Sequence, residues 1–597
     1  MAEQKVMDGN TAAAYIAYAF SEVAGIYPIT PSSSMGEKVD LWQTQGRPNI
    51  FGNPISITEM QSEAGVAGFV HGSLKSGALT TTFTCSQGLL LMLPNMYKIA
   101  GELLPTVFHV AARSLTTSAL SIFGDHSDVM AVRQSGFVLL AESSVQEVMD
   151  LSAVAHLASL EASLPFLNFF DGFRTSHECQ KISVLDQDDL KKMLNQEALA
   201  VFRSRSMSPN HPKASGSNQG PDLYFQQRET VNRHYQILPY VVQKYMAKIN
   251  QLRGTVYDLV NYYGDPEAKE IIVAMGSVAS TIEQTVDFLN QKGRKVGFLN
   301  IHLYRPFPID CFLAAIPKTV EKMAVLDRTK EAGAQAEPLF MDVQSALYNS
   351  HRRPVIIGGR YGIGSKDTRP DHILSVFEEL LSDNPKSPFT VGIEDDVTHL
   401  SLTNSQPLDL TPKSTYQALF WGLGGDGTVS ASHMTASLIG ENSTHTLQLY
   451  CHYDSRKQNG LTIANLRIGQ EALKSAYLIQ KTDFVSVSNQ AYLRQYDVLK
   501  GLKEGGVFLL NTTWTRKQVL RSLPKEIKVY LAKHRIRFYI INAYDILNKV
   551  GLPRQLAICL QTAFFALTHH LPHDLAFKTL KESLKDSFSD RSQPLPI

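Results

Sequence analysis

The segment Ile57–Gly72 combines acidic side chains with a run of small residues. Thr58-x-x-Gln61 matches the capping box found where helices begin, so we predict a helix that starts here. On that helix Glu59 and Glu63 lie four residues apart and share one face. Small residues follow Glu63, and such a surface lets a helix pack close to another backbone or to a planar ligand. The segment is either a carboxylate beside a flat binding surface or a solvated acidic face on a tightly packed helix.

Two further segments place polar groups where α/β proteins bind ligands. Pro28–Ser34 reads PITPSSS and predicts a turn whose hydroxyls can cap a helix entering at Met35. Arg113 follows the apolar run Val107–Ala112, at the predicted end of a parallel strand, where ligands bind in such sheets. An Arg there can hold a carboxylate with two parallel hydrogen bonds. A turn without a ligand and an Arg that caps a helix or forms an ion pair are the alternatives.

A glycine-rich motif lies in the last third of the chain. Gly422–Gly427 reads GLGGDG between a predicted strand and a predicted helix, and Glu441 follows it. This G-x-G-x-x-G spacing is typical of a phosphate at a helix N-terminus. Gly425–Gly427 also resembles the start of the magnesium–diphosphate motif of thiamine enzymes, but the Asn which that motif needs is absent from 443–458. We exclude a metal site here and retain nucleotide or coenzyme binding and a plain Rossmann-like turn as alternatives.

Composition excludes several classes of protein. The 597 residues carry 57 Lys and Arg against 56 Asp and Glu, a net charge of +1, so no overall field attracts nucleic acid or an acidic membrane. With 44% hydrophobic and 19% charged residues the chain is expected to be globular. No apolar run approaches the length of a membrane span, and the polar start, 1–8, predicts no secretory signal.

The cysteines are scattered and include no Cys-x-x-Cys pair. Iron–sulfur clusters and zinc sites use thiolates that lie close in sequence, so we expect this chain to hold neither by itself. A disulfide framework is unexpected at this density, which favours a reducing, cytoplasmic compartment. The five residues are Cys85, Cys179, Cys311, Cys451 and Cys559.

Alternation of strand-like and helix-like segments predicts three consecutive α/β domains with parallel sheets. A polar loop at 207–222, followed by a helical stretch to 253, and a Thr-, Ser-, Asn- and Pro-rich stretch at 404–412 mark the breaks. We therefore expect domains at residues 1–255, 256–405 and 406–585. The expected strands include 79–84, 106–112, 136–141, 165–169, 270–275, 295–301, 323–327, 354–358, 417–421, 447–450, 484–486, 507–510 and 537–541.

The segments above belong to a longer series of motifs that runs through the whole chain. The series begins with Tyr27–Ser33, Ile57–Gly65, Thr84–Leu90, Asn95–Lys98 and Ser121–Asp128. It continues with Leu303–Phe307, Leu326–Glu331, Gly358–Gly362, Gly422–Val429, Tyr453–Lys457 and Leu466–Gly469. In this order the motifs resemble those of the N-terminal half of single-chain pyruvate:ferredoxin (flavodoxin) oxidoreductases.

This resemblance implies a thiamine-pyrimidine domain, a transketolase C-terminal-like domain and a domain like the separate gamma subunit of multi-subunit relatives. It implies that Glu63 hydrogen-bonds the pyrimidine nitrogen of thiamine diphosphate, and that Thr30 and Arg113 contact the 2-oxoacid, with Arg113 on its carboxylate. It also implies coenzyme A as cosubstrate, with cofactor contacts at Gly424, Asp426, Gly427 and Thr428. The family's Gly-Ala-Asn-Lys is replaced here by Ser430–His433, which removes a positive charge and speaks against an unaltered coenzyme A contact.

The single-chain form of the family continues into a ferredoxin-like domain with iron–sulfur clusters and a thiamine diphosphate domain with the metal motif. We therefore expect this chain to act as a split pyruvate oxidoreductase that is inactive without a partner chain carrying those parts, in a homodimer or higher assembly. Pyruvate and other 2-oxoacids remain alternatives as substrate. A non-catalytic remnant or binding module, and the oxidoreductase-like part of a sulfite reductase flavoprotein, are alternative functions.

Overall fold

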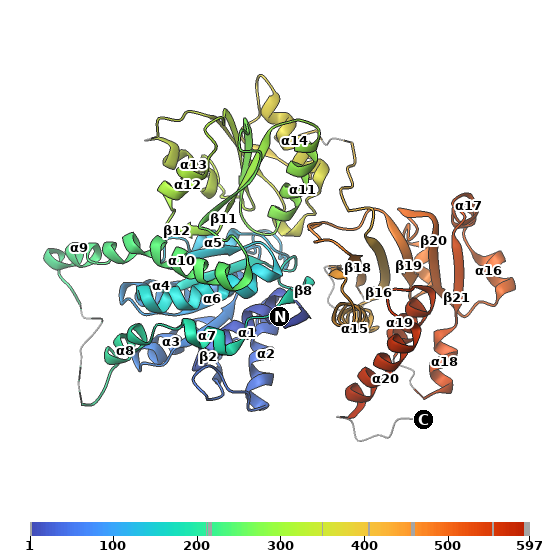
Figure 1. Cartoon of the computed structure of the whole chain (residues 1–597), viewed down its shortest axis with the longest axis horizontal. Helices are drawn as coiled ribbons and strands as arrows, with labels where there is room; N and C mark the ends of the chain where they lie inside the picture. The colour runs from blue at the N-terminus through green and yellow to red at the C-terminus, as the bar shows by residue number, and fades with distance from the viewer. Residues whose placement is uncertain are drawn as a thin grey trace.

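The computed structural model describes residues 3–589 apart from 211, 213–215, 217, 349, 404–405, 455–459 and 552–554. Within these residues the strands form three sheets with flanking helices, which Figure 1 shows as three adjoining lobes. The α/β class is therefore confirmed. Parts of the expected loop at 207–222, residues 404–405 of the expected linker and residues 455–457 of the motif at 453–457 lie outside the described residues.

The first sheet carries the N-terminal motifs. Its strands are β2 (Val23–Ile26), β3 (Ser56–Glu59), β4 (Thr80–Thr84), β5 (Val107–Ala112), β6 (Val138–Glu142), β7 (Phe166–Asp171) and β12 (Leu303–Arg305). The accompanying helices are α1 (Gly9–Phe20), α2 (Ser33–Thr44), α3 (Glu63–Lys75), α4 (Ser86–Gly101), α5 (Ser127–Ala131), α6 (Val145–Ala162), α7 (Gln187–Met193), α8 (Gln196–Ser204), α9 (Pro221–Glu229) and α10 (Asn232–Arg253). The strand order is β12-β6-β7-β5-β4-β2-β3. After β2 the chain adds β3 on one side of it and β4 on the other, so the order in which strands are added to the sheet reverses between β2 and β4. A crevice at the carboxyl ends of β2 and β4 is therefore where this topology favours a ligand.

The second sheet has the order β15-β14-β13-β10-β11-β9 and reverses between β10 and β13. Its strands are β9 (Val260–Gly264), β10 (Glu270–Ala274), β11 (Val296–Ile301), β13 (Lys322–Asp327), β14 (Val355–Arg360) and β15 (Phe389–Thr390). Its helices are α11 (Val278–Gln291), α12 (Ile309–Ala315), α13 (Pro338–Tyr348) and α14 (Pro370–Leu381). All neighbours are parallel except β9 on β11.

The third sheet is mixed, so the expectation of a parallel sheet in every domain is wrong for this unit, where β1, β8, β17 and β18 form antiparallel pairs. Its strands are β1 (Gln4–Met7), β8 (Cys179–Ser183), β16 (Tyr416–Leu423), β17 (Thr446–Tyr453), β18 (Leu461–Gly469), β19 (Thr482–Val487), β20 (Leu502–Asn511) and β21 (Arg537–Ile541). Its helices are α15 (Thr428–Glu441), α16 (Arg516–Ser522), α17 (Lys525–Lys533), α18 (Ala543–Lys549), α19 (Leu556–Leu567) and α20 (His573–Ser589). β18 runs antiparallel to both β16 and β17, whereas β16, β19, β20 and β21 are parallel.

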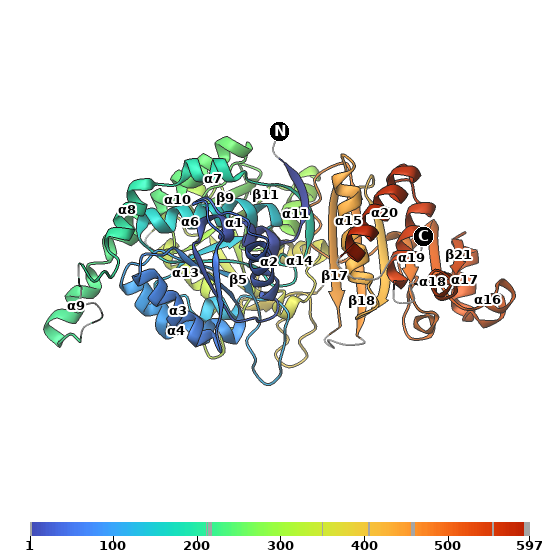
Figure 2. The ribbon, with the colours of Figure 1, turned by 90° about the horizontal axis from the view of Figure 1, so that it is seen from below.

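Strands exchange between the three units. β1 and β8, which precede the expected boundary at 255, extend the third sheet through β17, and β12 pairs with β6 of the first sheet. Figure 2 shows the N-terminal strand standing beside the third unit. These strands are 4, 5 and 3 residues long and therefore too short to carry a clear alternating pattern. The domain limits 1–255, 256–405 and 406–585 remain predictions.

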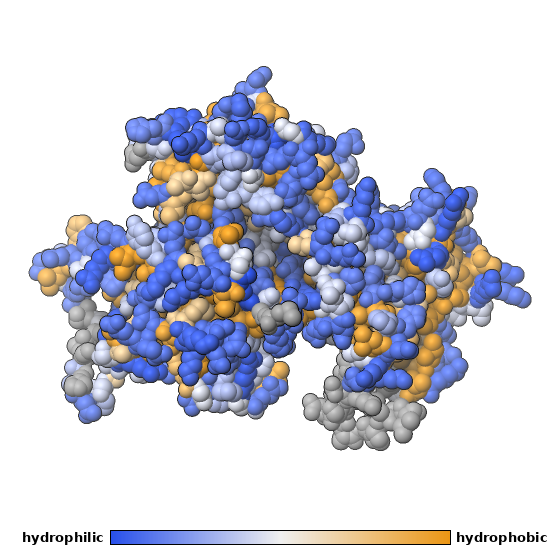
Figure 3. Space-filling model, in the orientation of Figure 1, coloured by the Kyte–Doolittle hydropathy of each residue, from blue (hydrophilic) through white to orange (hydrophobic). Residues whose placement is uncertain are grey.

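One edge of the third sheet exposes apolar side chains. Figure 3 shows them over β21 and α18, on the right-hand side of the molecule. β21 is the edge strand, and an apolar edge suits contact with another polypeptide. The exposed residues there are Tyr539, Ile540, Tyr544, Ile546 and Val550.

The buried carboxylate of Asp171 joins the first unit to the second. His126 Nε2 lies 2.7 Å from its Oδ1, while Arg328 Nη1 and the backbone N–H of Ser277 each lie 2.7 Å from its Oδ2. Burial alone would raise the pKa of Asp171, but the charges of Arg328 and His126 and the hydrogen bonds hold it well below its usual value. The end of β7 is thus fixed to the starts of two loops of the second unit.

We predict that Asp171→Asn lowers the free energy of unfolding by about 3–5 kcal/mol, because the buried guanidinium of Arg328 loses its counter-charge. Urea unfolding measures this change. The control is Asp545→Asn, whose ion pair with Lys549 is exposed and should contribute less than about 1 kcal/mol. Equal stability of the two variants would contradict the prediction.

Candidate functional site

The residues predicted to do chemistry in the first unit all lie at the carboxyl edge of its sheet. Thr30 follows β2, Glu63 follows β3 and Arg113 follows β5. The helix α4 begins among them at Ser86, directly after β4. The fold therefore collects these three side chains at the reversal point between β2 and β4.

Arg113 is hydrogen-bonded to the Thr30 segment. Its Nη1 donates to the Thr30 carbonyl oxygen at 2.8 Å, and its Nε donates to the Ser121 carbonyl oxygen at 3.2 Å. The residue is 6% exposed and forms no ion pair with a described acidic residue. Its Nη2 makes no hydrogen bond with a described residue. A buried guanidinium with this free donor can take a carboxylate oxygen.

Glu63 is the first residue of α3, and the sequence-based start of this helix was wrong. Residues 56–59 form β3, paired with β2, so Glu59 ends a strand and does not share a helix face with Glu63. The N-cap is Ser62, whose hydroxyl accepts from the backbone N–H of Gly65 at 3.1 Å. Strand pairing is a non-local contact, and it overrides the local capping-box signal.

The carboxylate of Glu63 is 7% exposed and accepts no hydrogen bond from a described residue. It lies against α4 at Gly88, where an added Cβ would stand 2.7 Å from Glu63 Oε1 and 2.8 Å from Thr84 Oγ1. Thr84 Oγ1 is itself buried without a hydrogen-bond partner in the described residues. A buried hydroxyl without a partner is rare and costly, and the Glu63 carboxylate beside it has no donor among the described residues, so a ligand that bonds to both groups suits this place.

Asp128 links two segments of the site, and the sequence alone did not predict this role. Its Oδ2 accepts from the backbone N–H groups of Ser86 at 2.7 Å and Arg113 at 3.0 Å. Burial raises the pKa of Asp128 to about 7, against the effect of these hydrogen bonds. It ties the start of α4 to the end of β5, and its only signal in the sequence was the motif 121–128.

The polar turn after β2 differs in detail from the prediction. The helix α2 begins at Ser33, not at Met35, and the Ser32 hydroxyl donates to the Thr84 carbonyl oxygen at 2.6 Å instead of capping it. The thiol of Cys85 donates to the Thr30 carbonyl oxygen at 3.2 Å. Burial raises the pKa of Cys85 to about 12, which makes it a poor nucleophile. A cavity of about 250 Å³ beside this turn is lined by Ser32, Glu37 and Glu59, among others.

Of the small residues after Glu63, Ala67 is fully buried in the core, whereas Gly68 and Gly72 do not pack against a described segment. A Cβ added at Gly68 or at Gly72 would meet no atom within 4 Å. This face of α3 is exposed at Ala64 and Gly68. The expected close approach of another backbone is therefore not made within the described residues.

The glycine-rich motif forms the predicted strand–turn–helix, from β16 to α15. Gly422 must be glycine, because a Cβ there would lie 2.0 Å from Thr428 Oγ1. Asp426 is used inside the turn: it accepts from the backbone N–H groups of Leu423 at 2.8 Å and Thr428 at 2.9 Å. The cavity at Thr428 has only about 20 Å³. Roles for Gly424, Asp426, Gly427 and Thr428 in ligand binding remain predictions.

Two further residues of α15, Glu441 and His433, do not contribute to the glycine-rich turn. Glu441 is the last residue of α15, at the opposite end of the helix from the glycines. His433 lies with its Nδ1 3.3 Å from Cys179 Sγ of β8, and burial lowers its pKa. Where the resembling family has a Lys, this chain therefore has a residue that packs between the first and third units.

No group of His, Cys, Asp and Glu suited to a metal ion occurs among the described residues. The cysteines Cys85, Cys179, Cys311, Cys451 and Cys559 are all free. None of the described helices is long and apolar enough to cross a membrane.

Comparison with known proteins gives matches along most of the chain. Residues 15–247 match the thiamine-diphosphate-binding family model of pyruvate flavodoxin/ferredoxin oxidoreductase, 268–373 match core domain II of pyruvate:ferredoxin oxidoreductase, and 417–595 match a further pyruvate ferredoxin/flavodoxin oxidoreductase model. The chain is 53% identical to a pyruvate-flavodoxin oxidoreductase of Enterobacter agglomerans, over 99% of this chain and 51% of that protein. It is 50% identical to a pyruvate:ferredoxin oxidoreductase of Moorella thermoacetica, over 99% of this chain and 51% of that protein. The chain thus spans about half the length of these curated relatives.

We predict that Gly88→Ala destabilises the protein by about 1–3 kcal/mol, because its Cβ would displace the Glu63 carboxylate. Thermal unfolding measures the change. Gly68→Ala is the matched control in α3: with open space around it, alanine should stabilise that helix by up to about 1 kcal/mol. If both variants are stabilised, Gly88 does not position Glu63.

Proposed function

The chain belongs to the pyruvate ferredoxin/flavodoxin oxidoreductase family, and from this membership we propose that it supplies the pyrimidine-side half of a thiamine diphosphate site. The proposed reaction is oxidative decarboxylation of pyruvate to acetyl-coenzyme A and carbon dioxide, with electrons passed to ferredoxin or flavodoxin. When bound, thiamine diphosphate supplies the electron sink that lets a 2-oxoacid lose carbon dioxide. The observation that carries the proposal is the buried carboxylate of Glu63, which no described residue satisfies.

Glu63 would accept a hydrogen bond from the ring of the cofactor. A carboxylate beside a ring nitrogen can hold or return a proton at that atom, which is general acid–base chemistry. The close contact at Gly88 fixes where the carboxylate lies, and the unpartnered Thr84 hydroxyl offers a second polar group beside it. These residues fit a planar, nitrogen-containing ring.

Arg113 and Thr30 would bind and orient the 2-oxoacid. The Nη1 and Nε atoms of Arg113 are occupied by backbone carbonyls, which fixes the guanidinium and leaves Nη2 for the substrate carboxylate. Thr30 adds a hydroxyl with no described partner. Because Arg113 is buried, its hydrogen bonds to a carboxylate would be made in a low dielectric, where they are strong.

The remaining parts of the reaction would come from polypeptide outside the three units, on a partner chain or on a continuation of this one. This proposal covers the diphosphate and metal ligands and the iron–sulfur clusters, and it is supported by the relatives, which are about twice as long as the part that this chain matches. The apolar edge at β21 offers a surface for such polypeptide, or for a second copy. The free thiols fit a reducing compartment such as the cytoplasm.

We propose coenzyme A as cosubstrate, with the turn Gly424–Thr428 as its contact. The N-terminus of a helix such as α15 favours phosphate, although the Thr428 N–H there already donates to Asp426. The packing of His433 on Cys179 and the small cavity at Thr428 argue for a weaker contact than the family motif would give.

We expect Glu63→Gln to reduce pyruvate-dependent viologen reduction by roughly 10²–10⁴-fold, the usual size of a general acid–base contribution. The assay uses the chain together with the polypeptide that carries the clusters. Glu197→Gln, on the exposed surface of α8, is the control and should leave the rate unchanged. A Glu63→Gln protein as active as the control would overturn the proposed role of Glu63. No pyruvate-dependent activity of the unaltered chain in the same assay would instead favour a non-catalytic binding module.

A further inference from the structure

A cavity of about 440 Å³ lies where all three units meet, apart from the Glu63 carboxylate. It opens at the carboxyl edge of the second sheet, between β10 and β13, where the strand order of that sheet reverses. Ser277 follows β10 and Arg328 follows β13. Arg174 enters from the first unit and Tyr450 from the third. The position is the one where open α/β sheets bind ligands.

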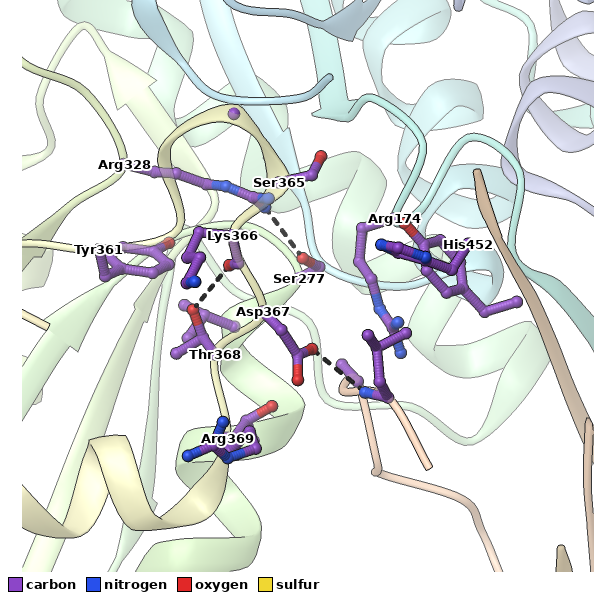
Figure 4. Close-up of a pocket in the computed structure, with 16 residues that line it drawn as sticks. Arg174, Ser277, Arg328, Tyr361, Ser365, Lys366, Asp367, Thr368, Arg369 and His452 are labelled. Atoms are coloured by element: carbon purple, nitrogen blue, oxygen red, sulfur yellow. Dashed lines mark hydrogen bonds between the residues drawn. The ribbon is translucent and has the colours of Figure 1, made fainter. Parts of the chain in front are cut away.

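Cationic side chains dominate the wall of this junction cavity. Arg174 and Arg328 are 7% and 6% exposed, and each has one carboxylate partner, Glu178 at 3.0 Å and Asp171 at 2.7 Å. Figure 4 shows Arg174 reaching into the space opposite Lys366, with His452 beside it. The ammonium of Lys366 forms no hydrogen bond or ion pair with a described residue.

Other charged groups on the wall are already engaged. Arg369 forms an ion pair with Asp371 at 2.6 Å. Asp367 is the acidic residue of the wall, and one of its oxygens accepts from the backbone N–H of Leu478 at 3.1 Å. The three arginines each have a carboxylate partner, and Asp367 forms no ion pair with a described residue. The wall therefore offers a ligand the Lys366 ammonium and spare arginine N–H donors, and the Asp367 carboxylate opposes part of that charge.

Two buried polar atoms of the wall lack partners within the described residues. They are Nε of Arg174 and Oγ1 of Thr281, a residue with 0% exposure. Leaving such atoms unsatisfied costs stability, so their presence at a cavity indicates a group that binds there. Thr281 belongs to the first turn of α11, a 14-residue helix whose N-cap, Ser277, makes no side-chain cap. At that end of the helix the Ser277 N–H donates to Asp171 and the Ala279 N–H to the Gly276 carbonyl oxygen, so part of its donor capacity is already used.

We propose that the junction cavity binds a phosphate-bearing small molecule. The Lys366 ammonium, the unpartnered Nε of Arg174 and the Thr281 hydroxyl are hydrogen-bond donors that match a phosphate group. The volume exceeds what one phosphate fills and falls within the range of small-molecule sites. Since the three units all contribute to its wall, a ligand here contacts all three at once. The proposal is independent of the thiamine diphosphate site.

The test is isothermal titration of the full chain with inorganic pyrophosphate and, separately, with adenosine diphosphate. Pyrophosphate reports the anion subsite alone, and a tighter Kd for the nucleotide shows that the rest of the cavity contributes. Lys366→Glu should raise both Kd values at least roughly tenfold. Lys292→Glu, at the opposite end of α11, is the matched control and should leave them unchanged.

Thr281→Val supplies a second readout. Removing an unsatisfied buried hydroxyl should raise the melting temperature of the ligand-free protein while it weakens pyrophosphate binding by roughly 3- to 10-fold. A purely structural Thr281 would not combine these two effects. Absence of pyrophosphate and nucleotide binding at millimolar concentration, or equal Kd values for Lys366→Glu and Lys292→Glu, would overturn the proposal.

Discussion

The buried carboxylate of Asp171 is the contact on which the arrangement of both sites depends. On one side it binds His126, the N-cap of α5. Asp128 of that helix binds the backbone N–H groups of Ser86, at the start of α4, and of Arg113. On the other side it binds Arg328 and the backbone of Ser277, which line the junction cavity. Burying a carboxylate is costly, and two cationic partners with well-aligned hydrogen bonds offset that cost. The same contact therefore orders two places that are far apart in the sequence.

Both proposed ligand sites contain buried polar atoms that have no hydrogen-bond partner among the described residues. Thr84 Oγ1 at the first sheet, and Arg174 Nε and Thr281 Oγ1 at the junction, are buried atoms whose hydrogen-bonding capacity the described residues do not fill. Such groups lower the stability of the free protein and are retained where a ligand can satisfy them. Close packing at Gly88 adds precision at the first of these places, because it leaves the Glu63 carboxylate little freedom to move.

The glycine-rich turn of the third unit behaves differently. Its motif forms the expected strand, turn and helix, yet Asp426 spends its oxygens on the turn itself and on the Ser488 hydroxyl. A motif that satisfies its own polar groups can be a structural turn or a weak phosphate contact. The spacing of the glycines does not distinguish a structural turn from a phosphate contact, because both need the same backbone conformation.

The sequence by itself determined the family, the α/β class, most strands and the position of Arg113 at a strand end. These follow from local patterns: apolar runs predict strands, and the chain order of motifs is unaffected by folding. The start of α3 and the short strands β1, β8 and β12 were decided by tertiary structure, because strand pairing between distant segments overrides or replaces a local signal. Arg174, Thr281, Lys366 and Tyr450 line the junction cavity although they are spread over about 280 residues of the chain. Only the packing of the three units brings them to one cavity, so no spacing in the sequence could have predicted it.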